Sequence, residues 1–127
     1  MFGIICAAPR WPCNNVGVLI SKPGYSAGYQ GSSLAIREAF SPLFERYGVQ
    51  LVLSGHEHDY QRSVPIGGVT YVISGAGGRT RGTGEEAFTV TSYAVYHYVD
   101  VNIWSDRLLL RAVDQDARVF DEVEISP

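Results

Sequence analysis

Two histidines one residue apart are the residues of this sequence best suited to chemistry. They are His56 and His58, in the stretch SGHEHDYQR that spans residues 54–62. On extended backbone, two imidazoles at this spacing can face the same way and ligate one metal ion or two adjacent ions. Gly55 allows a tight turn before them, and the carboxylates of Glu57 and Asp59 could orient the rings. The alternative is a pair of polar surface histidines in a loop, because a metal site needs a third and a fourth ligand.

Two buried strands and the helix between them are expected to position this pair. The runs VGVLIS at 16–21 and VQLVLSG at 49–55 are short, apolar and rich in β-branched residues. Between them, LAIREAFSPLFERYG at 34–48 repeats its apolar residues with helical spacing; Ser32 or Ser33 can cap its start. Pro42 is expected to kink this helix or split it. The strands of such a βαβ unit are parallel, which places the histidines at the carboxyl end of the second strand, where sites gather in open α/β sheets.

The C-terminal half is expected to be a β-meander. VTYVISG at 69–75 predicts a strand that leads into the glycine-rich loop GAGGRTRGTGEEA at 75–87. Strands are also predicted at 93–104, 107–114 and 118–125, with a two-residue turn at Ser105–Asp106. We therefore expect an α/β fold, a βαβ unit continuing into a β-meander. The chain is interpreted as one domain, 1–127, with an irregular lead-in at 1–15 followed by 16–127.

Composition limits the classes of partner. The chain has 127 residues, 46% hydrophobic and 18% charged, with a net charge of −3 and no run of Lys or Arg, so nothing favours nucleic acid or an anionic membrane. MFGIICAA at 1–8 has no basic region and no apolar run is long enough to cross a bilayer, which makes the cytoplasm the default location. Cys6 and Cys13 have no common zinc or redox spacing, and whether they pair stays open.

Two weaker candidates lie in the C-terminal half. Arg79 and Arg81, in the glycine-rich loop, could contact an anion together with backbone N–H groups; a flexible strand connection is the favoured alternative. His97 shares a strand face with valine and isoleucine, which indicates a core or interface histidine rather than a metal ligand.

Residues 47–78, YGVQLVLSGHEHDYQRSVPIGGVTYVISGAGG, closely resemble the C-terminal half of calcineurin-like metallophosphoesterases of the purple-acid-phosphatase-like branch. In that family a strand ends in G-H-x-H, followed by a Tyr and an Arg, and another strand runs into a glycine-rich loop. The likeness covers roughly residues 16–125. It implies about half of an α/β/β/α sandwich and a two-metal site that hydrolyses phosphate esters. By the same resemblance His56 and His58 would be metal ligands, one on each ion, with Zn, Fe or Mn as the divalent metal, while Tyr60 and Arg62 would mainly support the loop.

The sequence departs from that family at several ligand positions. The family's D-x-H, G-D-x-x-D and G-N-H-E motifs are not found. Its H-x-P-x-Y pattern matches SKPGY here, so Ser21 stands at the histidine position, Lys22 adds a cation, and Gln30 lies near a substrate-side histidine. We therefore expect a truncated or divergent metal-dependent phosphoesterase, weak or inactive as an isolated monomer. The alternative is a non-catalytic binding or structural module, or a self-associating fragment.

The expected partners follow from these departures. A phosphate ester or phosphate is the ligand that the resemblance implies. An exposed sheet edge and apolar patch are expected where a second half of the fold would pack, which favours a homo-oligomer or a separate N-terminal half as partner.

Overall fold

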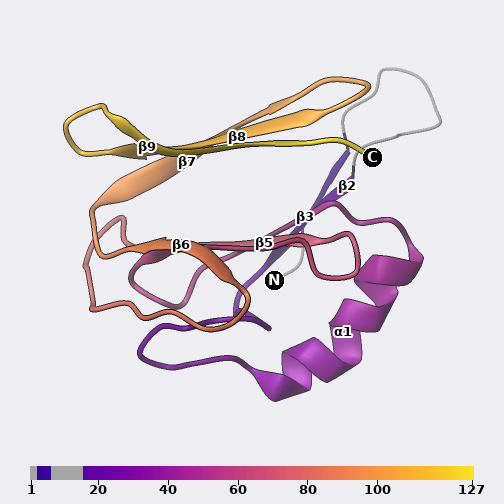
Figure 1. Ribbon diagram of the computed structural model, residues 1–127, viewed down its shortest axis with the longest axis horizontal. Coiled ribbons are helices and arrows are strands. Elements are labelled where there is room, and N and C mark those ends of the chain that lie inside the picture. The colour runs from indigo at the N-terminus through magenta and orange to yellow at the C-terminus, as the bar shows by residue number, and fades with distance from the viewer. Residues whose placement is uncertain (1–2, 7–15) are drawn as a thin grey trace.

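Two β-sheets lie face to face, and a helix covers the outer face of the larger sheet (Figure 1). The computed structural model describes residues 3–6 and 16–127. The larger sheet has six strands in the order β1-β2-β3-β5-β4-β6, and the smaller has the order β7-β8-β9. The elements are β1 (Gly3–Cys6), β2 (Val16–Ile20), α1 (Leu34–Arg46), β3 (Leu51–Ser54), β4 (Tyr60–Ser63), β5 (Thr70–Ser74), β6 (Thr89–Tyr93), β7 (His97–Ile103), β8 (Leu108–Asp114) and β9 (Val119–Ile125). The predicted α/β class, a βαβ unit that continues into a meander, is confirmed.

The predicted βαβ unit is present. β2 and β3 pair in parallel, with Gly17 opposite Leu51, and α1 connects them. The helix runs through Pro42 as one element of 13 residues, so of the two predicted outcomes, a kink or a split, the split does not occur. Ser33 is the N-cap residue, although its side chain makes no capping hydrogen bond. Gly48 has a φ of +65° just beyond the helix, a conformation that glycine adopts at little cost.

The meander forms a separate sheet rather than extending the first one. β7, β8 and β9 pair antiparallel in chain order. The Trp104 N–H donates to the Arg107 carbonyl over 2.9 Å, which closes the predicted two-residue turn at Ser105–Asp106. Within the larger sheet, β4 and β6 lie on the far side of β5, and the sequence pattern predicted neither of these two strands.

Two apolar layers hold the elements together. The first lies between the larger sheet and α1, and the second fills the space between the two sheets. Burying such side chains is worth about 1.5–3 kcal/mol each before chain entropy is counted. The buried members of the first layer are Val18, Ile20, Phe44, Val49, Val52, Val69 and Tyr71. Those of the second are Leu51, Tyr60, Val72, Leu108, Leu110, Ala112 and Ile125.

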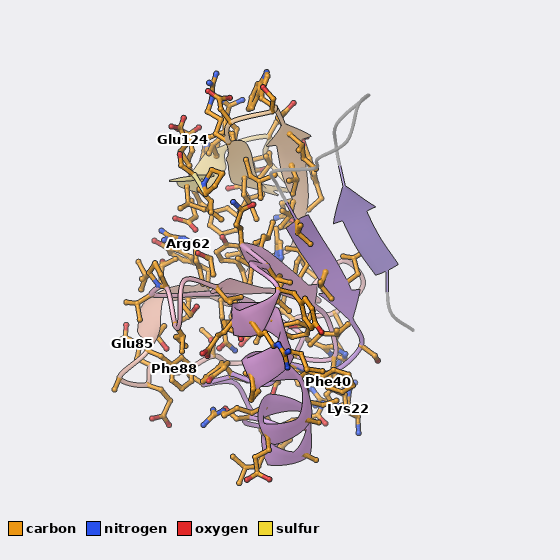
Figure 2. The ribbon with its side chains drawn as sticks, turned by 90° about the vertical axis from the view of Figure 1, so that its right-hand side faces the viewer. Lys22, Phe40, Arg62, Glu85, Phe88 and Glu124 are labelled. Carbon is orange, nitrogen blue, oxygen red and sulfur yellow. The ribbon has the colours of Figure 1, made fainter. Side chains whose placement is uncertain are left out.

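A polar clamp joins the two sheets. Arg62 of β4 donates from Nε and Nη2 to the two carboxylate oxygens of Asp121 in β9, over 2.7 and 2.8 Å. The Tyr60 hydroxyl donates to the same carboxylate over 2.6 Å. In Figure 2, Arg62 lies between Glu124 of β9 and Phe88, the residue that precedes β6.

Part of the lead-in lies within the described residues. Residues 3–6 form β1, which pairs antiparallel with β2. Cys6 ends this strand, while Cys13 lies outside the described residues, so the pairing of the two cysteines stays open. In the part of the chain that the structure describes, no helix is both long and apolar enough to span a membrane.

Candidate functional site

The two histidines lie in the turn between β3 and β4. β3 ends at Ser54, and the Glu57 N–H donates to the Gly55 carbonyl over 2.9 Å, which closes a tight turn. His56 is exposed and has a φ of +71°, a left-handed conformation that is uncommon outside glycine. The backbone is therefore turned rather than extended at His56, so the extended geometry that would align the two imidazoles is not the one adopted.

His58 has the clearer mark of a metal ligand. Its ring is partly buried, and its Nδ1 is a buried nitrogen without a hydrogen-bond partner among the described residues. Buried polar atoms usually have partners, so an unpaired imidazole nitrogen here fits a donor to a metal ion. The His58 carbonyl accepts the Arg81 N–H over 2.8 Å, which ties the turn to the glycine-rich loop.

Glu57 holds a neighbouring loop. Its side chain is 1% exposed, and Oε1 accepts the Gln30 N–H over 2.7 Å and the Ser26 hydroxyl over 3.3 Å. A Cβ on Gly28 would lie 2.8 Å from the Glu57 carboxyl carbon, so only glycine fits there without a shift. The carboxylate thus fixes the loop after β2 against the histidine turn, and the structure gives it no hydrogen bond to either imidazole among the described residues.

Asp59 completes a buried polar network beside Glu57. Asp59 is 1% exposed, and its Oδ2 accepts the Gln61 side-chain amide over 2.8 Å. The Gln61 carbonyl oxygen in turn accepts the Ala27 N–H over 2.8 Å. Burial raises the pKa of Asp59, against the opposing hydrogen bond from Gln61. Gln61, which the sequence did not single out, therefore anchors the loop after β2 from the other side.

Tyr60 and Arg62 both contact β9 through the carboxylate of Asp121. Burial, followed by the hydrogen bond to Asp121, raises the pKa of Tyr60 well above its usual value. The hydrogen bond to Asp121 raises the pKa of Arg62. Burial alone would raise the pKa of Asp121, but hydrogen bonds from Arg62 and Tyr60 hold it below its usual value. These side chains fasten the strand that follows the histidines to the second sheet.

His97 is a core histidine, as predicted from its strand face. It is 9% exposed, and its Nδ1 lies 2.9 Å from the Val95 carbonyl, which can only accept. Nδ1 therefore carries the proton, and Nε2 accepts the Ser74 hydroxyl over 3.0 Å. Both ring nitrogens are engaged, so His97 has no nitrogen left for a metal.

The carboxyl ends of the parallel strands meet at one edge of the larger sheet. Ser21 and Lys22 follow β2, the histidine turn follows β3, and the glycine-rich loop with Arg79 and Arg81 follows β5. Lys22 and Arg79 are exposed, and Arg81 is half-buried. A cavity of about 420 Å³ opens at this edge, between the ends of β2, β3 and β5 and the start of β7; it is lined by Leu19, Ile20, Leu53, Ser54, Gly55, Ser74, Gly77, His97, Tyr98 and Val99.

The residues present fit a metal ion only in part. The imidazoles of His56 and His58 are suitable donors, and the His58 ring has a buried nitrogen without a partner in the described part of the chain. Within residues 3–6 and 16–127, however, no cluster of three or more His, Cys, Asp or Glu side chains could hold a metal ion. Glu57 and Asp59 are the nearest carboxylates in the sequence. Glu57 Oε1 and Asp59 Oδ2 are engaged in the loop network, whereas Glu57 Oε2 and Asp59 Oδ1 are buried without a hydrogen-bond partner among the described residues. The described chain therefore offers part of a ligand set.

Comparison with known proteins relates this arrangement to phosphatases. No family model matches the chain. An acid phosphatase of Aspergillus ficuum is 46% identical over 50 residues, which are 39% of this chain and 8% of that protein. The chain resembles the C-terminal half of the calcineurin-like metallophosphoesterases.

Solved structures support the fold relationship. GAP50, the anchor in the inner membrane complex of Plasmodium, has a TM-score of 0.80 and 12% identity, with 99% of this chain and 53% of that chain covered. The purple acid phosphatase PPD1 of yellow lupin has a TM-score of 0.71 and 20% identity, with 85% and 24% covered. This chain thus spans less than two thirds of the length of each of these proteins, and the fold is that of part of a metallophosphoesterase domain.

Proposed function

We propose that this chain forms the histidine-bearing part of a divalent-metal phosphoesterase site, and that it needs ligands from another segment or chain to become active. The observation that carries this proposal is the partly buried His58, whose Nδ1 has no hydrogen-bond partner among the described residues. Exposed His56 lies two positions before it, in the turn that follows the carboxyl end of β3. The likeness to acid phosphatases supplies the reaction class, hydrolysis of phosphate esters.

The chain's own residues would position such a site rather than complete it. His56 and His58 would donate ring nitrogens to Zn, Fe or Mn. Glu57 and Asp59 would keep the adjoining loop in place, and the Arg62–Asp121 pair would hold β4 beneath the turn. A divalent ion, when bound, supplies charge that stabilises a phosphate in the transition state and lowers the pKa of a water ligand. Two imidazoles alone bind such ions weakly, which is why we expect little activity from the isolated monomer.

A metal titration tests this proposal. Zinc or manganese added to the purified chain should shift the imidazole NMR signals of His56 and His58, and the His58→Ala variant should lose most of the affinity. Hydrolysis of p-nitrophenyl phosphate should stay far below an enzyme-like rate. The absence of any metal-dependent shift would contradict the metal role. An enzyme-like rate that disappears in the His56→Ala/His58→Ala double variant would contradict the expected inactivity.

A non-catalytic scaffold is the second candidate. Ser21, a poor metal ligand, and exposed Lys22 follow β2 at the site edge, and a cation there opposes metal binding. GAP50, which is described as an anchor, supports a scaffolding role for this fold. If the scaffold role is right, the variant Ser21→His/Lys22→Ala should gain affinity for zinc over the wild type, because a ligand is added and a repelling charge removed. If the variant gains no affinity, Ser21 and Lys22 are not what opposes metal binding, and this argument for the scaffold role fails.

Self-association is the partner arrangement that we propose. Leu19 and Tyr98 line the edge cavity with exposed fractions of 41% and 59%, which leaves apolar surface open to another chain. A second copy or an N-terminal half of the fold would cover this surface. Light scattering at high protein concentration should give a mass above that of the 13.9 kDa monomer, and Leu19→Asp should lower it. A monomeric mass throughout would exclude self-association.

A further inference from the structure

The geometry points to a second element of the site: Tyr29 and Arg81 form a subsite for a phosphate ester with a flat aromatic leaving group. In this arrangement Arg81 contacts the phosphate and the Tyr29 ring stacks on the aromatic group. The inference rests on the proposed function in one respect, since it places the phosphate next to the histidine turn.

Two loops are fixed to the histidine turn. The loop after β2 is anchored by Glu57 and Gln61, and the side-chain amide of Gln30 donates to the His56 carbonyl over 3.3 Å. The glycine-rich loop after β5 is anchored where the Arg81 N–H donates to the His58 carbonyl over 2.8 Å. Each loop therefore hydrogen-bonds to the backbone of one histidine.

The side chains of these loops meet beside the turn. The Arg81 guanidinium lies over the Tyr29 ring, 5.2 Å from its centroid, a distance suited to cation–π attraction. Tyr29 is 80% exposed, the largest exposed fraction among the large apolar and aromatic side chains of the described residues. An aromatic ring that is held next to a cation and open to solvent is a surface on which a planar group can stack.

Arg81 has a charge available for an anion. Among residues 3–6 and 16–127, the arginines that form ion pairs are Arg62, Arg107 and Arg111, and none of these pairs involves Arg81. An arginine fork matches the oxygens of a phosphate well. The backbone N–H of Arg81 is hydrogen-bonded to the His58 carbonyl. A phosphate held by Arg81 would therefore lie close to the proposed metal ligands. An ester with an alkyl leaving group would use Arg81 alone, whereas an aryl ester would use Tyr29 as well.

The chain carries a matched control pair at the end of α1. The Arg46 guanidinium lies 5.6 Å from the Tyr47 ring centroid, and Tyr47 is 69% exposed. This pair has the same chemistry as Tyr29 and Arg81, but it lies at the opposite end of the βαβ crossover from the histidine turn. Substituting it tests whether any exposed arginine–tyrosine pair would bind the ligand.

The experiment is a set of NMR titrations of the purified chain with phenyl phosphate, glycerol 2-phosphate and inorganic phosphate, first with EDTA and then with zinc. The wild type should bind phenyl phosphate about fivefold more tightly than glycerol 2-phosphate, as expected for one stacking contact. Tyr29→Ala should remove this preference, and Arg81→Ala should weaken all three ligands about fivefold or more. Arg46→Ala and Tyr47→Ala should change neither result.

Three results would overturn the inference: equal affinity for the two esters, no loss in Arg81→Ala, or no detectable binding of any of the three probes. Its failure is separable from failure of the proposed function. Zinc binding that depends on His58, without an aryl preference, would keep the metal site and exclude the subsite. An Arg81-dependent aryl preference in EDTA, without zinc binding, would keep the subsite and exclude the metal site.

Discussion

The clamp between the sheets gives the sharpest prediction about stability. In Asp121→Asn the side chain keeps its shape but loses its charge, so Arg62 loses the partner of its bidentate pair and the Tyr60 hydroxyl loses a charged acceptor. The Arg62 and Asp121 side chains are 15% and 10% exposed, which leaves the arginine charge largely buried. We expect the variant to be clearly destabilised.

The size of the effect follows from this geometry. Breaking a fully buried ion pair on one side costs about 3–5 kcal/mol, and hydrogen bonds to charged groups are worth about 1.5–3 kcal/mol each. Because some water reaches the pair and asparagine can still accept one hydrogen bond, we expect about 2–3 kcal/mol. The unfolding entropy of a chain of 127 residues is about 0.27 kcal/mol/K, so the melting temperature should fall by about 7–11 °C.

Thermal melts of Asp121→Asn and Glu122→Gln at neutral pH test this reasoning. Glu122 pairs with Arg111 over 2.6 Å, as short as any bond of the clamp, but these side chains are 51% and 41% exposed. Exposed pairs contribute little, so Glu122→Gln should leave the melting temperature unchanged within error. Equal shifts in the two variants would refute the view that burial makes the clamp strong.

Three further predictions concern the acid limit and the two loops. The pKa of Asp121 is lowered in the folded state, so the stability that its carboxylate adds is present above about pH 4 and is lost as the pH falls through the folded pKa. In urea melts at decreasing pH, the unfolding free energies of the wild type and Asp121→Asn should therefore converge. Gly75→Ala should lower stability by about 2 kcal/mol or more in urea melts, because its Cβ would overlap the Glu57 carbonyl oxygen, while Gly77→Ala, which meets open space, should not. Glu57→Ala should cost about 2 kcal/mol and speed hydrogen exchange at Gln30 N–H, and unchanged exchange would contradict its anchoring role.

The sequence predicted the elements whose side-chain pattern is local. β2, α1 and β3 are short apolar or helically periodic runs, and β7, β8 and β9 alternate between an apolar and a polar face. Such patterns depend on the period of each element, which a single sequence displays. The resemblance added the family, and the sequence motif G-H-x-H placed the histidines at a strand end, where the structure has them.

The two missed strands show what a single sequence does not display. β4 reads YQRS and β6 reads TVTSY, and neither has the apolar run by which a strand is recognised. In β4 the polar side chains are buried because their partners come from distant segments: Gln61 binds the Ala27 N–H, 34 positions away, and Arg62 binds Asp121, 59 positions away. The only sequence signal for β4 was that its polar residues follow soon after the end of a strand. Nothing in the local sequence indicated that these polar side chains would be buried.

Long-range hydrogen bonds also determine how the loop beside the histidines is held. Glu57 and Asp59 are buried carboxylates, and burying a charge is costly unless hydrogen bonds compensate for it. Glu57 is compensated mainly by the loop after β2, through the Gln30 N–H and the Ser26 hydroxyl. The position of that loop therefore depends on the residue between the two histidines. This is why the framework around the histidines is intact in a chain whose described residues supply only part of a ligand set, and why loss of the loop network and loss of metal binding should be separable by substitution.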